Sequence, residues 1–525
     1  MQRQAHGFNA PDPPSELSDA ITAAPASVVF PVAESEPGTV PFSFMFPDLT
    51  DDDLLTPSET MLADLAELGA SMQDTDDDTQ FNSAIPAAYT YFAQFIDHDI
   101  TFSDVKKEEG QTDSELLADP NLSPWSKKEI EEKVRNKRTT ALQLECVYGN
   151  ISPGQLPPRD GQKFVLGQVC PHHGRPADKD ENNDLPRLGH SKNPKKDRAA
   201  FINDPRNDSN LIVSQIHVAF LRAHNAIVDQ LECPFDDAKL ILQKSYQWMV
   251  YNEFLPRFVR QEDIKAAHDK PLFDHLSGVP LEFSVGAFRF GHSLVRKIYY
   301  LNDNFSRVPL QRLFMLTVLS NGLTATLGEG CLCLPGNKII EWRKFLGGEK
   351  GRNNARMIRP QLVEPLSTLL DEANKPVNGE TRLAVQDLKR GYMLRIPTGQ
   401  ALADRMGVAK LTPDDLKAVA VNPRQLKALG SSEFLEKTPL WFYVLAEAAK
   451  QNADAEKENT EAAKQNIDKL GPVGGRIVAE AITGFIRRTP DSFLIKDWTP
   501  AKFGFKPNTF FIPDLLRLAG VLEKL

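Results

Sequence analysis

The sequence predicts an all-α, mainly helical fold in a single large domain with few or no strands. Apolar residues recur at three- and four-residue spacing through most of the chain after residue 211, and strand-like alternation is rare. The 525 residues, 41% of them hydrophobic, can also bury a substantial core. Helices are predicted over residues 211–231, 238–260, 281–297, 310–324, 363–372, 381–392, 439–450 and 476–487.

The first 43 residues are predicted to form an N-terminal extension, because they are rich in Pro, Ala, Ser and Glu. We expect the domain to occupy residues 44–525. Residues 103–137 and 451–469 are strongly polar and are predicted to be surface insertions, the first with one short helix over residues 126–134.

Charge and cysteine content restrict the partners and the compartment. The chain has 61 basic and 71 acidic residues, a net charge of −10, which gives no indication of nucleic-acid or anionic-membrane binding. Five scattered cysteines do not form a disulfide scaffold. Neither a signal peptide nor a transmembrane segment is predicted. We therefore expect a soluble protein, cytoplasmic by default, with leaderless secretion as the alternative.

The most informative segment is a helix predicted over residues 86–102, which carries a histidine between two carboxylates. At 100° per residue its apolar stripe lies opposite a polar face. The stripe contains Phe92, Ile96 and Ile100, and the polar face contains Gln94, Asp97, His98 and Thr101. The polar face of this helix is therefore the first candidate for a functional site.

Asp99 lies on the apolar flank of the same helix, between Phe92 and Phe95. An ionised carboxylate there costs several kcal/mol unless a cation or several hydrogen-bond donors meet it. The alternative is a solvent-facing aspartate near a helix end.

Two further residues invite a functional interpretation. Arg206 precedes a predicted helix start, where the helix dipole favours an anion, so a negative or polar partner is expected nearby. A solvated arginine paired with Asp204 or Asp208 is the alternative. His292 lies on an apolar stripe, where a hydrogen-bonded core histidine is more usual than a ligand.

Three segments together resemble a known family. YTYFAQFIDHDITF (89–102), NDPRNDSNLIVSQIHVAFLRAHN (203–225) and GAFRFGHSLVRK (286–297) are similar to the distal, arginine and proximal motifs of the animal-type haem peroxidases, in the family's order. TPLWFYVL and LGPVGGRIVAE are similar to segments of its bacterial-type members. The resemblance covers residues 44 to 525 and implies a helical domain around one buried b-type haem.

The resemblance implies roles for the distal residues. His98 corresponds to the distal histidine, a base and then an acid toward hydrogen peroxide. Gln94 faces the same pocket one turn earlier. Arg206 corresponds to the distal arginine, which stabilises the charge that develops as the O–O bond breaks.

On the proximal side, the resemblance makes His292 the haem-iron ligand. Arg289 corresponds to an arginine that pairs with a haem propionate. Asp387 stands where the family generally has asparagine, as the acceptor for the second nitrogen of His292, which would stabilise high-valent iron. The alternative is that Asp387 pairs with Lys389, Arg390 or Arg382 and does not reach the haem.

Two departures concern the haem link and calcium. Asp97 matches a residue that forms a haem ester in mammalian members, but Ser209 replaces the second ester-forming residue, so at most one link is expected. Asp99 matches a calcium ligand, and the segment TTALQLECVYG matches the rest of that site. Its expected oxygen donors are Thr139, the carbonyl of Ala141, Gln143 and Glu145. Because Gln143 replaces an aspartate, we expect a weakened Ca²⁺ site, or an empty one in which Asp99 meets protein donors.

The resemblance favours a peroxidase that reduces hydrogen peroxide and oxidises a phenol-like or small inorganic donor through a ferryl intermediate. One alternative is a dioxygenase or peroxygenase of lipid or specialised metabolism. Such enzymes use a tyrosine where this chain has Arg289, which favours the peroxidase. A non-catalytic haem- or calcium-binding module is the third possibility.

His217 and His224 are expected to satisfy hydrogen bonds in the core.

Overall fold

Helices dominate the structure, a computed structural model. It describes residues 39–74, 81–108, 111–149, 157–169, 182–187, 199–273, 278–314, 333–347, 353–369, 376–495, 498–500 and 509–522. The α-helices are α2 (Met61–Ser71), α3 (Ala88–Ile100), α4 (Asp113–Ala118), α5 (Lys127–Lys133), α6 (Glu145–Tyr148), α8 (Leu211–Leu231), α9 (Phe235–Met249), α10 (Leu255–Phe258), α11 (Gln261–Asp269), α12 (Leu310–Phe314), α14 (Trp342–Phe345), α15 (Leu383–Met393), α16 (Gly399–Met406), α17 (Pro413–Ala418), α18 (Pro423–Gly430), α19 (Leu440–Glu458), α20 (Glu461–Lys464), α21 (Pro472–Arg488) and α22 (Ile512–Leu518).

Shorter turns and strands connect these helices. The 3₁₀ turns are η1 (Asp51–Asp53), η3 (Pro205–Asp208), η6 (Ala287–Leu294), η8 (Gly336–Lys338), η9 (Glu364–Ser367) and η10 (Glu433–Leu435), and the π-helices are η4 (Val250–Phe254) and η5 (Glu282–Gly286). The strands are β1 (Val40–Ser43), β2 (Gln73–Asp74), β3 (Asn82–Pro86), β4 (Ser103–Val105), β5 (Val134–Asn136), β6 (Arg159–Asp160), β7 (Lys163–Phe164), β8 (Val279–Pro280), β9 (Ile298–Tyr299), β10 (Val308–Pro309), β11 (Asn354–Arg356) and β12 (Leu362–Val363). The mainly helical fold predicted from the sequence is confirmed, because every strand is short.

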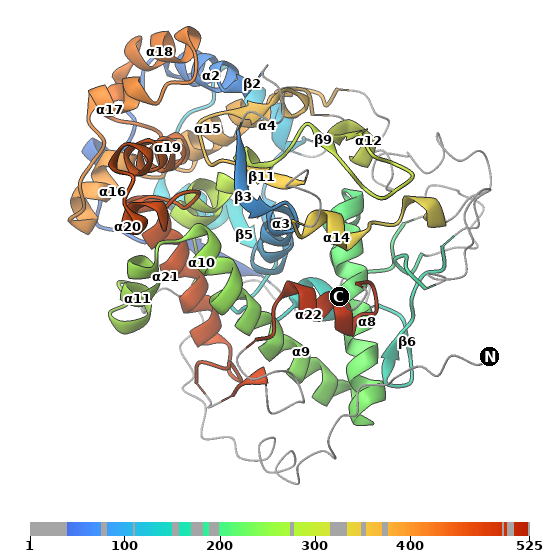
Figure 1. Cartoon of the computed structure of the whole chain (residues 1–525). Coiled ribbons are helices and arrows are strands. Elements are labelled where there is room, and N and C mark those ends of the chain that lie inside the picture. Colours follow the sequence, from blue (N-terminus) through green and yellow to red (C-terminus); the bar gives the residue numbers. More distant parts are fainter. Residues whose placement is uncertain are drawn as a thin grey trace.

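Helix α3 lies in the middle of the molecule, with α8, α9, α10 and α21 around it (Figure 1). Its apolar face packs on α8 and α9 through aromatic rings: Phe95 stacks on Phe220 at 4.7 Å between centroids, and Tyr246 meets both Phe92 and Phe95 edge-on. Burying one such side chain stabilises the fold by about 1.5–3 kcal/mol. This packing fixes α3 and therefore the direction of its polar face.

Helix α8 spans the residues that the sequence predicts, 211–231. The side chain of Asn210 accepts hydrogen bonds from the amides of Ile212 and Val213, at 3.1 and 3.0 Å, and so caps the helix start. By length and composition alone α8 is apolar enough to cross a membrane, but 83% of the relevant window is buried inside the protein, as in a core helix.

The segment predicted as one helix over residues 281–297 is instead a π-helix, η5, followed by the 3₁₀ turn η6. The backbone of Gly286 adopts φ −108° and ψ −94°, which is outside the helical region, so the helix ends there. The prediction for residues 363–372 is also wrong where the structure describes them. Val363 belongs to β12, which pairs with β2, and Pro365 opens the short turn η9.

The other predicted helices correspond to α9–η4–α10, α15, α19 and α21, with different ends. The predicted helix over residues 310–324 begins as α12, and its residues 315–324 lie outside the described part. In the predicted insertions, residues 103–137 form β4, α4, α5 and β5, and residues 451–469 contain the end of α19 and α20. Helices α2 and α15 approach closely, since a Cβ on Gly69 would lie 2.8 Å from the side chain of Val385.

The N-terminal strand β1 is part of the body of the protein, although the sequence assigned residues 40–43 to the extension. It pairs antiparallel with β5 and parallel with β8, in a sheet ordered β4-β5-β1-β8. The buried carboxylate of Glu282 accepts hydrogen bonds from the amides of Met45 and Phe46 just after the strand. These hydrogen bonds thus join the segment after β1 to the π-helix η5, more than 200 residues later in the chain.

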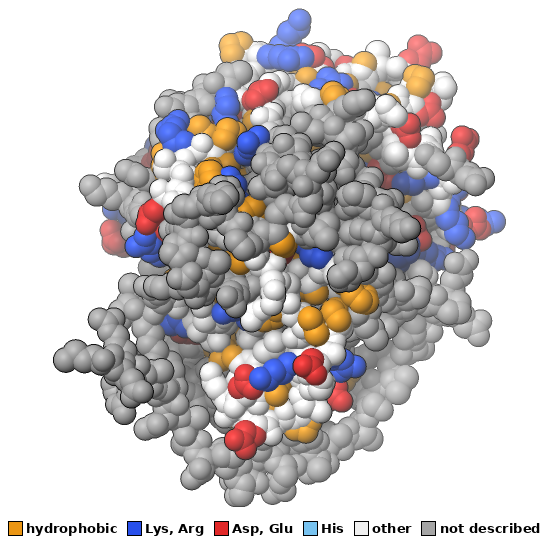
Figure 2. Space-filling view, turned by 90° about the vertical axis from the view of Figure 1, so that its right-hand side faces the viewer, with side chains coloured by type: hydrophobic (Ala, Val, Ile, Leu, Met, Phe, Trp, Pro, Cys, Tyr) orange, Lys and Arg blue, Asp and Glu red, His pale blue; other side chains and the backbone are white. Residues whose placement is uncertain are grey.

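On the face in Figure 2, acidic and basic side chains lie interspersed in the part that the structure describes. Cys333 is disulfide-bonded, whereas Cys146 and Cys233 are free. Because disulfides persist in oxidising compartments, the expected cytoplasmic location gains no support from the structure and stays a prediction.

Candidate active site

A cavity of about 520 Å³ lies between the polar face of α3 and the turn η6. Gln94, Asp97, His98 and Thr101 all line it from α3, as the helical spacing predicts. Arg289 and His292 line it from η5–η6, and Arg206 lies at the α3 side. The cavity therefore brings together two histidines and two arginines from segments nearly 200 residues apart.

His98 is buried, and one of its nitrogens is held. Its Nδ1 lies 2.7 Å from Oδ1 of Asn207, while its Nε2 makes no hydrogen bond to a described residue. Burial lowers the pKa of His98 to about 4, and the positive charge of Arg206 adds to this effect. The imidazole is therefore neutral near pH 7 and has a free nitrogen that can accept a proton.

Arg206 is fixed at the end of α3. Its Nε and Nη2 donate to the two carboxylate oxygens of Asp204, at 3.0 and 2.6 Å, and Nη2 also donates to the carbonyls of His98 and Thr101. The guanidinium lies over the ring of Phe102, 4.4 Å from its centroid. Pairing with Asp204, which the sequence left open, thus occurs, yet Arg206 still lines the cavity.

Asp204 joins two arginines in this buried network. Arg138, 1% exposed, donates to Asp204 at 2.5 Å and to the carbonyl of His98 at 3.1 Å. Burial of Asp204 opposes its ionisation, but Arg206 and its other partners lower its pKa below the usual value. The ionised carboxylate holds both guanidinium groups beneath α3.

The remaining polar residues of α3 are also positioned. The Gln94 side chain accepts a hydrogen bond from Asn210 at 3.0 Å and lies 3.5 Å from the hydroxyl of Ser209. Asp97 accepts a hydrogen bond from the hydroxyl of Thr101 at 3.0 Å. Asp97 therefore presents a carboxylate to the cavity, and Ser209 lies near the same wall.

On the opposite wall, His292 is hydrogen-bonded to Asp387. Nδ1 of His292 lies 2.7 Å from Oδ2 of Asp387, and Arg289 donates to the other carboxylate oxygen. Although burial alone would raise the pKa of Asp387, His292 and Arg289 hold it below its usual value. Asp387 accepts the Nδ1 proton, so Nε2 of His292 is available as a ligand toward the cavity.

A third arginine, Arg390, lines the cavity from α15, three residues after Asp387. It pairs with Asp113 at 2.8 Å, and Asp113 also contacts Lys107. Nε of Arg390 is buried without a hydrogen-bond partner in the described part of the chain. Arg289 and Arg390 thus place two guanidinium groups on the cavity wall, each paired with an aspartate of the protein.

Asp99 points away from the cavity and is fully buried. Its two oxygens accept hydrogen bonds from the amides of Leu144 and Cys146, at 3.0 and 3.2 Å. Burial, together with the nearby carboxylate of Glu145, raises the pKa of Asp99 to about 7. Asp99 therefore meets several protein donors, which is one of the two alternatives for a buried carboxylate on this flank.

The loop with the expected calcium ligands folds against Asp99. Glu145 accepts hydrogen bonds from the amide of Thr139 at 3.0 Å and from Gln143 at 2.9 Å, and the Thr139 hydroxyl contacts it as well. Leu144 has φ +57°, in the left-handed region. Thus Thr139, Gln143 and Glu145 gather beside Asp99. The described residues contain no cluster of three His, Cys, Asp or Glu side chains suited to a metal, and the expected role of the Ala141 carbonyl stays a prediction.

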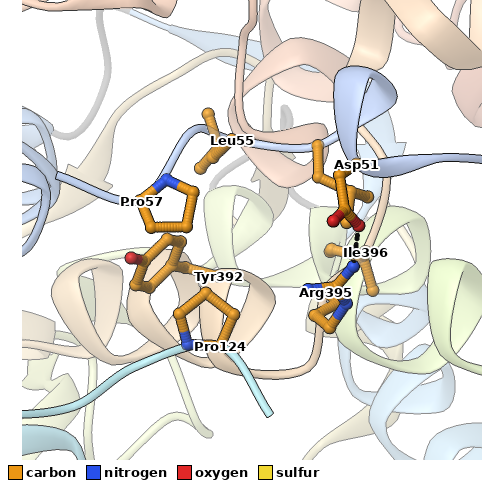
Figure 3. Close-up of a pocket in the computed structure, with 8 residues that line it drawn as sticks. Asp51, Leu55, Pro57, Pro124, Tyr392, Arg395 and Ile396 are labelled. Atoms are coloured by element: carbon orange, nitrogen blue, oxygen red, sulfur yellow. Dashed lines mark hydrogen bonds and ion pairs between the residues drawn. The ribbon is translucent and has the colours of Figure 1, made fainter. Parts of the chain in front are cut away.

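A second, smaller cavity lies between the 51–57 segment and the end of α15 (Figure 3). Its volume is about 60 Å³, room for roughly two water molecules. Tyr392 and Pro57 face each other across it, and Arg395 reaches the carboxylate of Asp51. This cavity is too small for an organic cofactor, so the chemistry belongs in the cavity beside α3.

Sequence reasoning missed several residues that shape the site. Asn207 holds His98, and Arg390 adds a guanidinium to the wall. Asp204, expected from the sequence only as an alternative partner of Arg206, also caps η3. The position of Arg390 on one face of a helix with Asp387 was a usable signal. Nothing in the sequence pairs Asn207 with His98, which lies 109 residues away.

Known proteins resemble this chain in sequence and in fold. The family model for the animal haem peroxidases matches residues 122–324. A peroxidase-like protein of Margaritifera margaritifera is 28% identical over 256 residues, 40% of this chain and 32% of that protein. Peroxidase mlt-7 of Caenorhabditis elegans is 26% identical over 330 residues, 59% of this chain and 41% of that protein. The chain thus matches less than half the length of either relative.

Two solved structures share the fold. Peroxidase A from Dictyostelium discoideum superposes with a TM-score of 0.57 at 15% identity, over 93% of this chain and 94% of that chain. A fatty acid alpha-dioxygenase of Arabidopsis thaliana superposes with a TM-score of 0.55 at 13% identity, over 88% of this chain and 76% of that chain. The fold is therefore that of the helical peroxidases and dioxygenases.

Residues 122–324 thus match the animal haem peroxidase family, and the rest of the described chain shares the fold of a peroxidase. The family implies haem binding, and the residues of the cavity fit that cofactor: a histidine with a free Nε2 faces it, and two arginines on the wall suit the haem carboxylates. The narrower expectation of a bacterial-type member stays a prediction.

Proposed function

We propose that this protein is a haem-dependent peroxidase that reduces hydrogen peroxide and oxidises a phenol-like organic or a small inorganic donor. The observation that carries the proposal is the pairing of His98 and His292 on opposite walls of one cavity. His98 is neutral and has a free nitrogen, as an acid–base group requires. His292 is hydrogen-bonded to a carboxylate, as is usual for a histidine that binds a metal.

A b-type haem would be held by His292 through Nε2, with Arg289 and Arg390 facing its carboxylates. When bound, the haem iron supplies the redox chemistry that couples peroxide reduction to donor oxidation. The hydrogen bond between Asp387 and Nδ1 of His292 increases the basicity of the ligand and lowers the reduction potential. A lower potential favours phenol-like donors over halides.

His98 is proposed to move the proton. Its Nε2 accepts a proton from hydrogen peroxide and returns it to the departing oxygen. Arg206 keeps a positive charge beside this nitrogen and stabilises negative charge on the departing oxygen. Gln94, held by Asn210, is proposed to orient the peroxide through its amide.

Asp97 is the proposed site of at most one covalent haem link, an ester. Its carboxylate lines the cavity, and the second ester-forming position of the family is Ser209, which cannot form that bond. Release of haem into acidified organic solvent from the wild-type protein and from Asp97→Val tests this. An unchanged covalently retained fraction in Asp97→Val would exclude the ester.

A weak Ca²⁺ site at Asp99 and Glu145 is part of the same proposal. Two carboxylates, one of them raised in pKa by burial and by the charge of the other, suit a hard divalent ion, although their oxygens also accept hydrogen bonds from protein groups. The alternative reaction class, fatty-acid dioxygenation, is disfavoured because Arg289, bonded to Asp387, occupies the position expected for a tyrosine.

The test measures the second-order rate constant for peroxide with the haem-loaded protein, from the change in its Soret absorption under stopped flow. Removing an acid–base group costs about 10²- to 10⁴-fold, so we expect losses in that range for His98→Ala and smaller ones for Arg206→Ala. His268→Ala, which removes an exposed histidine, is the matched control and should react as the wild type does.

Unchanged rate constants in both His98→Ala and Arg206→Ala would contradict the proposal. Haem binding without any reaction with peroxide would instead indicate a non-catalytic binding module. Oxygen consumption with a fatty acid, in the absence of peroxide and a donor, would indicate a dioxygenase.

A further inference from the structure

Behind His98, away from the cavity, a buried asparagine links two histidines. Oδ1 of Asn207 lies 2.7 Å from Nδ1 of His98, and Nδ2 of Asn207 lies 2.9 Å from Nδ1 of His217. Asn207 and His217 are both 0% exposed, and neither lines the cavity. The three side chains come from α3, η3 and α8, so the row crosses the core behind the active site.

We infer that Asn207 is a positioning residue that keeps the proton of His98 on Nδ1, so that Nε2 faces the cavity unprotonated and can act as the base. The inference rests on the proposed function. It assigns a role that neither Arg206 nor Gln94 fills, because no hydrogen bond joins their side chains to the His98 ring among the described contacts.

The chemistry of an amide explains why the direction of Asn207 matters. Its oxygen only accepts and its nitrogen only donates. With the oxygen toward His98, the histidine must donate from Nδ1, which leaves Nε2 with its lone pair. With the amide turned by 180°, Nδ1 of His98 would accept, its proton would be on Nε2, and the base would be lost.

His217 and Cys146 lie on the nitrogen side of the Asn207 amide, opposite His98. Nδ1 of His217 accepts from Nδ2 of Asn207, so its own proton is on Nε2, which has no hydrogen-bond partner in the described part of the chain. His217 lies edge-on to Phe95, with 6.3 Å between ring centroids, in an apolar part of the core. The unpaired N–H is therefore placed at His217 rather than at the base.

The Asn207 amide leaves the transferred proton on His98. When Nε2 accepts a proton from peroxide, the imidazolium has protons on both nitrogens and donates from Nδ1 to the amide oxygen. The amide does not take that proton, so the same proton can leave again from Nε2. Arg206, Asp204, Asp97 and Arg138 are the charged groups around His98, and His217 on α8 and Cys146 on α6 are the titratable groups behind it.

The experiment uses the haem-loaded full chain and replaces Asn207 with leucine, which has a similar volume but no polar atoms. We expect the rate constant for peroxide to fall about 10- to 100-fold, the range for losing a partner that orients a functional histidine. Asn225→Leu is the matched control: this asparagine on α8 also makes two hydrogen bonds, both to Phe164 and outside the cavity, and its loss should leave the rate unchanged.

Asn207→Asp separates positioning from a merely structural role. A carboxylate can still accept from Nδ1 and should preserve the rate near neutral pH. Its negative charge stabilises the imidazolium, so the acidic limb of the pH–rate profile should move to higher pH. A structural role alone predicts no such displacement.

Cyanide binding provides a reading that does not depend on peroxide turnover. Hydrogen cyanide must give up its proton to a base when cyanide binds ferric haem, so its affinity reports whether Nε2 of His98 is free. We expect weaker cyanide binding in Asn207→Leu and wild-type binding in Asn225→Leu. If cyanide affinity falls in Asn207→Leu but not in Asn225→Leu, and the wild type does not react with peroxide, the proposed function fails and the inference on Asn207 stands.

Wild-type cyanide affinity and a wild-type pH–rate profile in Asn207→Leu would overturn the inference. An equal loss in Asn225→Leu would also overturn it, because the effect would then reflect a general disturbance of the core. If His98→Ala loses its reactivity with peroxide while Asn207→Leu keeps the wild-type reactivity, the proposed function stands and only the positioning role of Asn207 is removed.

Discussion

At the scale of the residue, the two histidines of the cavity differ because their surroundings differ. His98 is buried beside the cation Arg206, which favours the neutral ring, whereas His292 is bonded to the anionic Asp387, which strengthens it as a ligand. In the proposed function one residue type serves two chemical purposes within a single cavity, and the neighbouring charges decide which.

The lowered pKa of His98 predicts the pH dependence of the reaction with peroxide. Because the ring must be neutral to accept a proton, the rate constant should be constant between about pH 5 and 8 and should fall as the pH drops through about 4. Stopped-flow measurements across this range test it. An acidic limb centred near the ordinary histidine value of about 6.5 would show that burial does not govern His98.

The helical spacing of residues 86–102 was sufficient to predict which side chains of α3 face the cavity. It could not identify Asn207 as the partner of His98, because contacts between distant segments depend on how α3 and η3 pack. The family resemblance predicted that Asp387 accepts from His292 but left a surface pairing open, and the structure places the carboxylate against His292.

At the scale of the element, local signals decided where prediction succeeded. Helix α8 has a polar cap at Asn210 and a continuous apolar pattern, so its ends were predicted. In the 281–297 segment the same apolar spacing occurs in a π-helix and a 3₁₀ turn, and periodicity does not distinguish these from an α-helix. The turn η6 nevertheless carries the proposed ligand His292.

The loop next to Asp99 predicts an effect of calcium that depends on pH. At pH 8 Asp99 is ionised beside Glu145, and a divalent cation should relieve their repulsion, so millimolar Ca²⁺ should raise Tm more at pH 8 than at pH 5. Gln143→Asp adds a third carboxylate and should strengthen this effect. If Ca²⁺ leaves the Tm of Gln143→Asp unchanged at pH 8, there is no calcium site in this loop.

At the scale of the whole molecule, buried carboxyl groups join segments that are far apart in the chain. Glu282 accepts from the amides that follow β1, and Glu447 accepts from the amides of Val473 and Gly474 at the start of α21. Burial raises the pKa of both groups to about 7. Such long-range contacts could not be predicted from the sequence, where both glutamates appear within helical segments.

These groups predict that the folded protein loses stability as the pH rises. The folded state retains the proton of Glu282 up to about pH 7, whereas the unfolded chain releases it near 4.5, so the free energy of unfolding falls between these values. At 1.4 kcal/mol per pKa unit the loss is on the order of 3 kcal/mol.

Thermal unfolding between pH 5 and 8 measures this loss. Tm should fall less with pH in Glu282→Gln than in the wild type, because the amide oxygen can still accept from Met45 and no longer titrates. Glu59→Gln, at an exposed position, should behave as the wild type does. Equal pH dependence in all three proteins would show that Glu282 does not contribute to the pH dependence of stability.

The central claim is that the cavity between α3 and η6 holds one haem ligated by His292. Haem titration of the wild type, His292→Ala and His98→Ala, followed by absorption and electron paramagnetic resonance spectra, tests it most directly. We expect the wild type to bind one haem per chain and to show the spectra of histidine-ligated haem. His98→Ala should show the same spectra. His292→Ala should lack them until imidazole is added. A His292→Ala protein that binds haem with the wild-type spectrum would contradict the claim.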